Sequence, residues 1–229
     1  MNLIISPIYN AILETAAMVN AIDQFSTMPF VHILVDDNST IPVSENVRAT
    51  KNRRVLRINS DVPDWIHKSQ LGQAVQLGYD YATQEWMNEI PKQPIDHVFL
   101  IESDVVVKAD WDKKQIDLIP TLPEDWASLD VQSVDTDGRL TYPTVISPRH
   151  GFVRDDLEHQ HYADFQCTLF NPLVLPEKSG VKFSDFRSHF DILWSRKIEE
   201  LTGRKHYRTM LINAFHYGSA SRSTLPKEL

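Results

Sequence analysis

The sequence predicts an α/β protein: a three-layer α/β/α sandwich built on a mostly parallel central sheet, with a more irregular second half. In the first hundred residues, short apolar runs alternate with segments whose apolar residues recur every three or four positions. Strands that are apolar on both faces and alternate with helices are typical of a parallel sheet covered by helices. Beyond Val107 the pattern loosens, and prolines separate shorter elements.

The expected elements of the first half follow from these patterns in order. Strands are expected at residues 3–5, 31–35, 54–58 and 98–101. Helices are expected at residues 11–25 and 69–82, where apolar residues fall on one helical face. We expect one compact unit, residues 1–229, with halves at 1–107 and 108–229. In the second half, a helix is expected at 184–201, ended by Gly203, and an edge strand at 210–216.

Composition excludes some classes of function. The formal net charge is −8 and the sequence pI is about 5.5, which argues against a dedicated nucleic-acid binder. The densest basic stretch, residues 51–57, is expected to be a solvated loop entering a strand. Cys167 is the single cysteine and lies in an apolar run, so no intrachain disulfide is possible. Without a signal-peptide pattern or a membrane-length apolar run, we expect a cytoplasmic protein and no transmembrane segment.

Polar residues follow three of the expected strands. In an open α/β sheet, ligands bind beyond the carboxyl ends of the strands. The polar strand ends are Ser6-Pro7 with Tyr9-Asn10, then Asp36-Asp37-Asn38-Ser39, and Glu102-Ser103-Asp104. Any one of them could instead shape a turn or cap a helix.

The third strand end is the most informative. If the strand continued, Glu102 and Asp104 would share one face and Ser103 would point away. Two carboxylates on one face suit a hard divalent cation, because Mg²⁺ uses one or two carboxylates together with substrate phosphates. Such a cation would neutralise the charge of a departing diphosphate.

Four motifs resemble those of the GT-A class of nucleotide-sugar glycosyltransferases, particularly glycosyltransferase family 2. The stretch from Leu3 to Asn10 resembles "vIIPtYN", and the stretch from Ile33 to Thr40 resembles "vvDDgST". The helix from Gly72 to Ala82 resembles "GxaxNxGxxxA", with Gln76 in place of the usual Asn. Residues 99–104 resemble "xflDaDd", with Glu102 replacing the first Asp. The resemblance runs along most of the chain in the family's order.

The resemblance implies a nucleotide-sugar-binding half, residues 1–107, and an acceptor-binding and catalytic half, residues 108–229. It implies that Pro7 and Tyr9 flank the nucleoside and that Asp37 hydrogen-bonds the base. Ser103 belongs to the same donor site. Glu102 would face the ribose or the water shell of the cation, although its extra methylene could let it reach the metal. The residues implied for metal binding are Asp104 and His216, the latter in a segment resembling "v.H.g.S.s".

The resemblance also indicates a diphosphate contact and a base. Arg222 could meet the diphosphate, or could be a surface arginine. The family's base comes from an "ED" at the start of a late helix, where this chain has Phe190-Asp191. Asp191 is the preferred base for an acceptor hydroxyl; Asp185, in a stretch resembling "GFdE", is the alternative, and either could simply cap the helix. The stretch at 149–156 resembles a mobile loop that closes over donor and acceptor.

The resulting hypothesis is a metal-dependent glycosyltransferase that uses Mn²⁺ or Mg²⁺ and a nucleotide-diphosphate sugar, with a UDP-sugar favoured. Transfer to an acceptor hydroxyl would proceed with inversion. A glycan acceptor is favoured and a modified nucleic-acid base remains open. Two alternatives remain: a non-catalytic nucleotide-sugar-binding protein, and a nucleotidyltransferase of similar fold. The latter would normally show a glycine-rich basic loop after the first strand, which Ser6-Pro7-Ile8-Tyr9-Asn10 does not provide.

Overall fold

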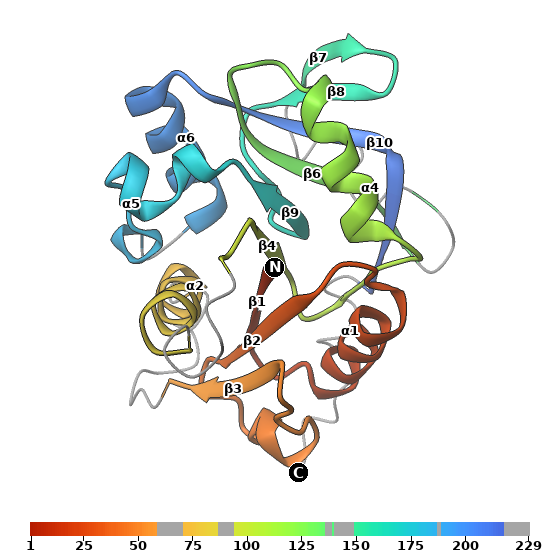
Figure 1. Cartoon of the computed structure of the whole chain (residues 1–229), viewed down its shortest axis with the longest axis vertical. Coiled ribbons are helices and arrows are strands. Elements are labelled where there is room, and N and C mark those ends of the chain that lie inside the picture. Colours follow the sequence, from red (N-terminus) through yellow and green to blue (C-terminus); the bar gives the residue numbers. More distant parts are fainter. Residues whose placement is uncertain (59–70, 87–93, 136–138, 140–148, 187–188, 218–229) are drawn as a thin grey trace.

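The structure is a computed structural model that describes residues 1–58, 71–86, 94–135, 139, 149–186 and 189–217 (Figure 1). Its strands are β1 (Asn2–Ile8), β2 (Phe30–Asp36), β3 (Arg53–Arg57), β4 (His97–Ile101), β5 (Val105–Val106), β6 (Trp126–Val134), β7 (Arg149–Arg154), β8 (Leu157–Gln160), β9 (Cys167–Phe170) and β10 (Lys205–His216). Its α-helices are α1 (Ile12–Phe25), α2 (Leu71–Asp80), α4 (Trp111–Leu118), α5 (Pro176–Ser179) and α6 (Phe190–Thr202). Short 3₁₀ turns are η1 (Val43–Glu45), η4 (Ile119–Thr121), η5 (Pro172–Val174) and η6 (Phe183–Asp185), and the π-helical η3 (Tyr81–Trp86) continues α2.

One mixed sheet runs through the described parts of both halves. Its strand order is β3-β2-β1-β4-β9-β6-β10-β8-β7, and β5 pairs with β10 beside this path. The first four strands are parallel, and β6 and β10 are parallel too, whereas β9, β8 and β7 run antiparallel to their neighbours. The predicted α/β class, with parallel strands in the first half, is therefore confirmed.

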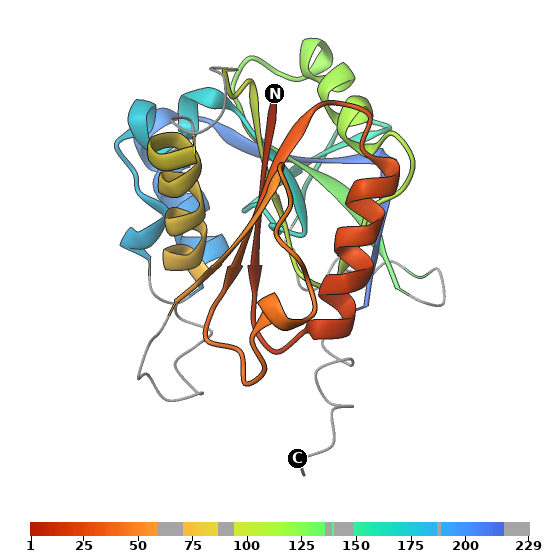
Figure 2. The same cartoon turned by 60° about the horizontal axis from the view of Figure 1, so that its bottom comes forward.

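Helices cover both faces of the sheet, as Figure 2 shows with α1 and α2 on opposite sides. Alternating residues of β1 explain this arrangement, because successive side chains of a strand point to opposite faces. Ile4 belongs to the core that contains α1, and Ile5 belongs to the core that contains α2. Complete burial of an aliphatic side chain of this size contributes about 1.5–3 kcal/mol, so both faces hold the helices strongly.

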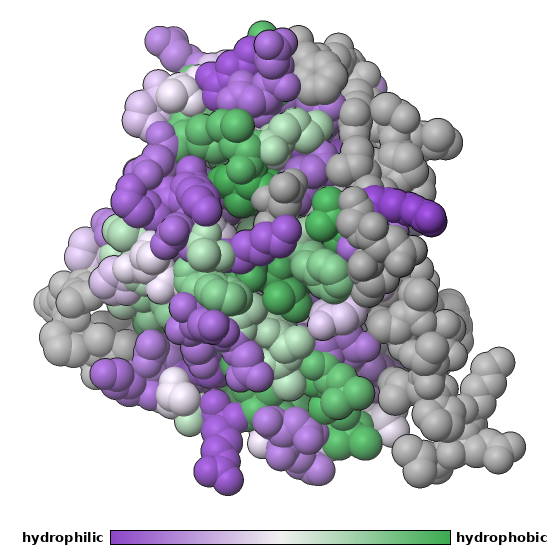
Figure 3. Space-filling view, turned by 90° about the vertical axis from the view of Figure 1, so that its right-hand side faces the viewer, coloured by the Kyte–Doolittle hydropathy of each residue, from purple (hydrophilic) through white to green (hydrophobic). Residues whose placement is uncertain are grey.

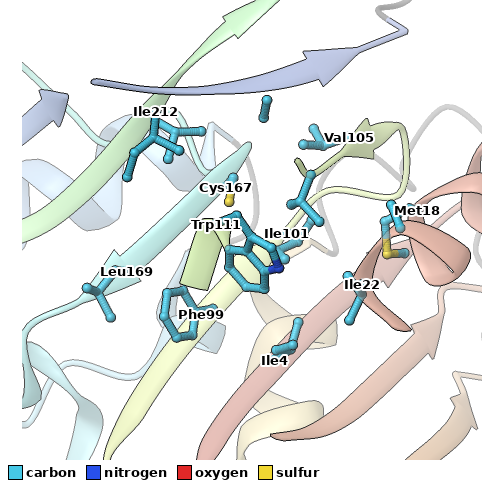
Figure 4. Packing of buried hydrophobic residues seen from close by; sticks show 14 of the residues in the cluster. Ile4, Met18, Ile22, Phe99, Ile101, Val105, Trp111, Cys167, Leu169 and Ile212 are labelled. Carbon is cyan, nitrogen blue, oxygen red and sulfur yellow. The ribbon is translucent and has the colours of Figure 1, made fainter. Parts of the chain in front are cut away.

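The α1 core also contains α4, which joins the two halves. Trp111, in the first turn of α4, packs edge-on against Phe99 of β4 with ring centroids 5.0 Å apart (Figure 4). Its indole N–H donates to Ser26 Oγ at 3.1 Å, so this large side chain is buried with its polar atom paired. Cys167 lies in the same core and is fully buried, where burial raises the pKa of its thiol well above its usual range.

Two glycines explain why α2 lies so close to its neighbours. A β-carbon at Gly78 would lie 2.9 Å from Cγ2 of Ile5, and one at Gly72 would lie 2.4 Å from the carbonyl oxygen of Phe183. Gln76, which replaces the usual Asn, accepts the Phe183 N–H at 2.8 Å through Oε1. The helix motif read in the sequence therefore fixes α2 against the sheet and against η6.

The second half differs from the sequence prediction in three places. The expected loop at 149–156 is a β-hairpin, because β7 and β8 pair antiparallel. The expected edge strand at 210–216 is the end of β10, which starts at Lys205 and lies between β6 and β8. The expected helix at 184–201 begins only at Phe190, after the 3₁₀ turn η6. Polar residues of β10 such as His206 and Arg208 interrupt the apolar pattern of this strand, although both are buried within the sheet.

The surface is ordinary for a folded domain. Figure 3 shows one face on which apolar residues emerge between hydrophilic ones. Large apolar side chains that are exposed include Leu13 on α1 and Leu211 on β10, and scattered exposure of this kind is normal. In the part of the chain that the structure describes, no helix has the length and apolar character needed to cross a membrane.

Candidate functional site

The carboxyl ends of β1, β2 and β4 meet at one edge of the sheet. The parallel register places Ile8 beside Asp36 and Ile5 beside Leu100, so the polar residues that follow each strand lie at the same edge. Pro7 is buried within β1, and Tyr9 follows it half-buried. This is the position at which open parallel sheets bind their ligands, and it is where the sequence placed the nucleoside contacts.

Asp36 organises the turn after β2. Its Oδ1 accepts the Ser39 N–H at 2.8 Å, and its Oδ2 accepts the Val43 N–H at 3.1 Å. Arg57, directly opposite on β3, donates to the same Oδ2 at 3.0 Å. The hydrogen bonds of Asp36 therefore support the alternative that this residue shapes a turn. Arg57 was missed as a functional neighbour, although pairing strands 31–35 and 54–58 in parallel would have placed it beside Asp36.

The basic stretch at 51–57 is not the solvated loop that we expected. Arg53 is buried in β3, where its guanidinium pairs with Asp23 of α1 and its Nε donates to His32 Nδ1 at 3.4 Å. Burial, and secondly the charge of Arg53, hold the pKa of His32 well below its usual range. The charge of Arg53 is therefore used inside the protein, whereas Arg54 and Arg57 are only partly buried.

The loops after β1 and β2 are tied together. Asn10, with a left-handed φ of 50°, accepts the Thr40 N–H at 2.8 Å, and its own N–H donates to Ser39 Oγ at 3.0 Å. Asp37 donates its N–H to the Ile8 carbonyl at 2.8 Å, and the residue is buried. The structure thus places Tyr9 and Asp37 in one cross-linked pair of loops. Their contacts with a nucleoside remain a prediction.

The acidic strand end is a turn and not a continuation of β4. The strand ends at Ile101, and the Val105 N–H donates to the Glu102 carbonyl at 3.1 Å, which closes a turn over residues 102–105. The expected alternation of faces is therefore wrong in its geometry. The turn nevertheless brings the Glu102 and Asp104 side chains together, while Ser103 is buried at its apex.

His216 reaches this turn from the far end of the chain. The short strand β5 pairs antiparallel with the end of β10, with Val105 beside His216, and the Tyr217 N–H donates to the Asp104 carbonyl at 3.0 Å. His216 Nε2 lies 3.4 Å from Asp104 Oδ1 and 3.8 Å from Glu102 Oε2. The structure thus brings together the three residues that the sequence associated with the cation.

These three side chains fit a divalent metal. Their ligand atoms all lie within 4.8 Å of one another. Two ligands of one ion lie at most about 4 Å apart, twice a metal–oxygen bond of about 2.1 Å, and both distances from His216 meet that limit. Two carboxylates with one imidazole suit Mn²⁺, which accepts oxygen and nitrogen ligands. Asp104 is fully buried and Glu102 is partly exposed, so the group opens toward solvent on the Glu102 side.

The two candidate bases have different surroundings. Asp185 Oδ2 accepts the Lys182 N–H at 3.0 Å and so caps the 3₁₀ turn η6. Asp191 lies in the first turn of α6, where burial raises the pKa of its carboxyl above the usual range. A raised pKa suits a general base that must hold a proton during transfer. Which of the two carboxylates serves as the base remains a prediction.

A ring contact and a backbone hydrogen bond connect the beginning of α6 with Glu102. The ring of Phe190, next to Asp191, stacks on Phe165 with centroids 4.9 Å apart. Gln166, the residue after Phe165, accepts the Glu102 N–H with its carbonyl oxygen at 3.1 Å. Gln166 carried no motif and was missed by the sequence analysis. Arg222, the expected diphosphate contact, lies outside the described residues.

The fold is that of the GT-A glycosyltransferases, as comparison with solved structures shows. Residues 1–349 of S. aureus TarS match with a TM-score of 0.64 at 14% identity, over 97% of this chain and 62% of that one. The same TarS region in complex with UDP-GlcNAc gives 0.62 at 15% identity, over 98% and 61%. GalNAc-T7 with UDP, GalNAc and Mn²⁺ gives 0.62 at 11% identity, over 94% and 43%. No protein-family model and no curated protein sequence matches the chain.

The matches establish the fold and no more, because the identities are low. The chain spans about three fifths of the TarS region and less than half of GalNAc-T7. The predicted GT-A architecture is confirmed. The activity, the donor and the acceptor are inferred below from the site.

Proposed function

We propose that this protein is a metal-dependent glycosyltransferase that transfers a sugar from a UDP-sugar to an acceptor hydroxyl with inversion. The observation that carries the proposal is the Glu102–Asp104–His216 group at the carboxyl edge of a GT-A sheet. Similar solved structures support a UDP-sugar donor, since the TarS complex contains UDP-GlcNAc and the GalNAc-T7 complex contains UDP and Mn²⁺. A glycan acceptor and a cytoplasmic location belong to the same proposal.

Each residue has a definite role in the proposed reaction. Asp104 and His216 would hold the cation with Glu102 beside them, and a bound Mn²⁺ or Mg²⁺ would neutralise charge on the diphosphate leaving group. Pro7, Tyr9 and Asp37 hold the uridine at the ends of β1 and β2.

Asp191 takes the proton of the acceptor hydroxyl. The oxygen then forms a bond to the anomeric carbon as the carbon–oxygen bond to the diphosphate breaks, and UDP leaves on the opposite face. The raised pKa of Asp191 makes its carboxylate a stronger base than an exposed aspartate, so the proton transfer is more favourable. Attack opposite the leaving group inverts the anomeric centre.

A screen of nucleotide-sugars with Mn²⁺ tests the proposal. We expect one UDP-sugar to raise the melting temperature and to release UDP in a reaction that EDTA stops. Thermal stabilisation without UDP release under any acceptor would instead indicate a non-catalytic binding protein. Release of pyrophosphate from UTP and a sugar phosphate would indicate a nucleotidyltransferase. Either result would overturn the transferase assignment.

A further inference from the structure

Residues 163–166 form an irregular segment directly beside the metal group. The segment precedes β9, and its last residue, Gln166, accepts the Glu102 N–H with its carbonyl oxygen at 3.1 Å. The Gln166 side chain is held as well, since its Oε1 accepts the hydroxyl of Ser133 on β6. The position of Glu102 therefore depends on where this segment lies.

The segment holds an unfavourable backbone conformation. Phe165 has a φ of 60°, in the left-handed region that costs an L-residue with a bulky side chain about 1–2 kcal/mol. Such a conformation persists only where the surroundings over-determine it. The ring itself is buried against Phe190 and Trp194, which fixes the side chain but leaves the neighbouring peptide groups to be held by hydrogen bonds.

Asp130 supplies one of those hydrogen bonds. This residue lies fully buried in the middle of β6, opposite Thr168 of β9 and Arg208 of β10. Its Oδ2 accepts the Asp164 N–H at 3.0 Å, on the residue directly before Phe165. The Thr168 hydroxyl donates to Oδ1 and orients the group. A single buried carboxyl therefore ties β9 to the peptide N–H of the residue that precedes the left-handed Phe165.

Other contacts reinforce the segment from both sides. The Asp164 side chain forms a buried ion pair with Arg208, and the Ala163 N–H donates to Ser195 Oγ of α6 at 2.9 Å. Arg208 thus lies next to Asp130 in the sheet and binds the residue whose N–H Asp130 accepts. The segment is anchored to β6, β10 and α6 at once.

We propose that Asp130 is a positioning residue for the metal group: it fixes the 163–166 segment and, through the Gln166 carbonyl, the place of Glu102. The inference rests on the proposed metal-dependent function. It assigns a role to a buried residue that is not a member of the Glu102–Asp104–His216 group. Residues that orient metal ligands typically change metal affinity by about 10- to 100-fold when they are replaced.

The test compares two buried aspartates. Asp130→Asn keeps the size of the side chain but leaves one acceptor oxygen in place of two, so the Asp164 N–H and the Thr168 hydroxyl can no longer both donate to it as they do to the carboxyl. Asp112→Asn is the matched control: Asp112 is equally buried and accepts the Thr27 and Met28 N–H groups at 3.1 and 2.9 Å, before β2 at the opposite end of the sheet. Mn²⁺ affinity of the full chain, with UDP present, is measured by electron paramagnetic resonance, and unfolding by thermal melting.

We expect Asp130→Asn to weaken Mn²⁺ binding about 10-fold. Asp112→Asn should lower the melting temperature and leave Mn²⁺ affinity within about 2-fold of wild type, because sites that share no partners act independently. If Asp130→Asn does not fold, Thr168→Val serves instead: it removes the hydroxyl that orients the carboxyl and should weaken Mn²⁺ binding in the same direction. In a Glu102→Gln background, Asp130→Asn should have little further effect, because it acts through Glu102.

Three outcomes overturn the positioning role: wild-type Mn²⁺ affinity in Asp130→Asn, an equal loss in Asp112→Asn, or an undiminished effect in the Glu102→Gln background. These outcomes leave the proposed function intact as long as the wild-type protein binds Mn²⁺. A wild-type protein that does not bind Mn²⁺, with or without UDP, overturns the metal site and the positioning role together.

Discussion

Two buried carboxylates, Asp36 after β2 and Asp104 after β4, stand at the same edge of the sheet and have different surroundings. Asp36 receives two backbone N–H groups and the guanidinium of Arg57. Asp104 faces the imidazole of His216, with Glu102 alongside. The neighbouring strand determines the surroundings: β3 supplies a permanent cation to Asp36, and β10 supplies an imidazole, the proposed metal ligand, to Asp104. The role of a carboxylate at a strand end is therefore inferred from the side chain that the neighbouring strand places beside it.

Asp104→Ala tests the metal side of this comparison and has the largest expected effect. Removing a ligand takes away charge stabilisation worth several kcal/mol, so Mn²⁺-dependent UDP release should fall by about 10³-fold. The measurement is UDP release from the donor found in the screen. Release that continues at the wild-type rate would remove Asp104 from the metal site.

Replacing each candidate base by asparagine separates Asp191 from Asp185. Loss of a general base costs about 10²- to 10⁴-fold, so Asp191→Asn should lower the transfer rate by that factor while Mn²⁺ binding is retained. Asp185→Asn should cost about 1 kcal/mol of stability, as expected for a cap, and keep the transfer rate. The reverse pattern would exchange the two roles.

Arg57→Met tests the structural side of the comparison. The substitution leaves the Asp36 carboxylate buried without its cation, so we expect a loss of about 1–3 kcal/mol in the free energy of unfolding. Mn²⁺ affinity should not change. Arg54→Met is the matched control on the same strand, because the Arg54 guanidinium lies over the Trp86 ring at 4.5 Å and should contribute less than about 1 kcal/mol. Equal losses of unfolding free energy in the two variants would show that the Asp36–Arg57 ion pair stabilises the protein no more than the Arg54–Trp86 contact does.

The pH dependence of transfer is the smallest and most specific expected effect. Burial raises the pKa of Asp191, and a base works only when deprotonated. The transfer rate should therefore fall with decreasing pH along a limb that lies above the usual aspartate pKa of about 3.9. Mn²⁺ binding measured over the same range separates this limb from loss of the cation. A limb at the usual value, with Mn²⁺ still bound, would argue against Asp191.

Local patterns predicted the first half of the molecule well. Apolar strands such as β1, β2 and β4 and the amphipathic α2 are defined by neighbours in sequence, and their parallel order follows from the alternation of strands and helices. The function of Asp36 could not be predicted in the same way, because its motif is shared by turn-forming and ligand-binding residues. Only the pairing with β3 brings Arg57 to it.

The second half was harder to predict because its strands contain buried polar residues. His206 is satisfied by Ser128 Oγ at 2.9 Å and the Ser195 carbonyl at 3.1 Å, and Arg208 pairs with Asp164. Because these side chains are polar, the strand lacks the apolar pattern by which strands are recognised. Their partners come from other elements, so the local sequence does not show that the polar groups are satisfied. The residues Asp104 and His216 were predicted from motifs. The turn and the two-residue strand β5 that bring them together were not.

The pairing of β5 with β10 would give the proposed cation a second effect. Asp104 comes from the first half of the chain and His216 ends the last described strand, so one ion bound to both would act as a cross-link that closes most of the second half into a loop. A ligand that binds only the folded chain stabilises it by mass action. Loss of the cation should therefore loosen the end of β10 from β5 first, and hydrogen exchange at the Tyr217 amide, which donates to Asp104, would report it.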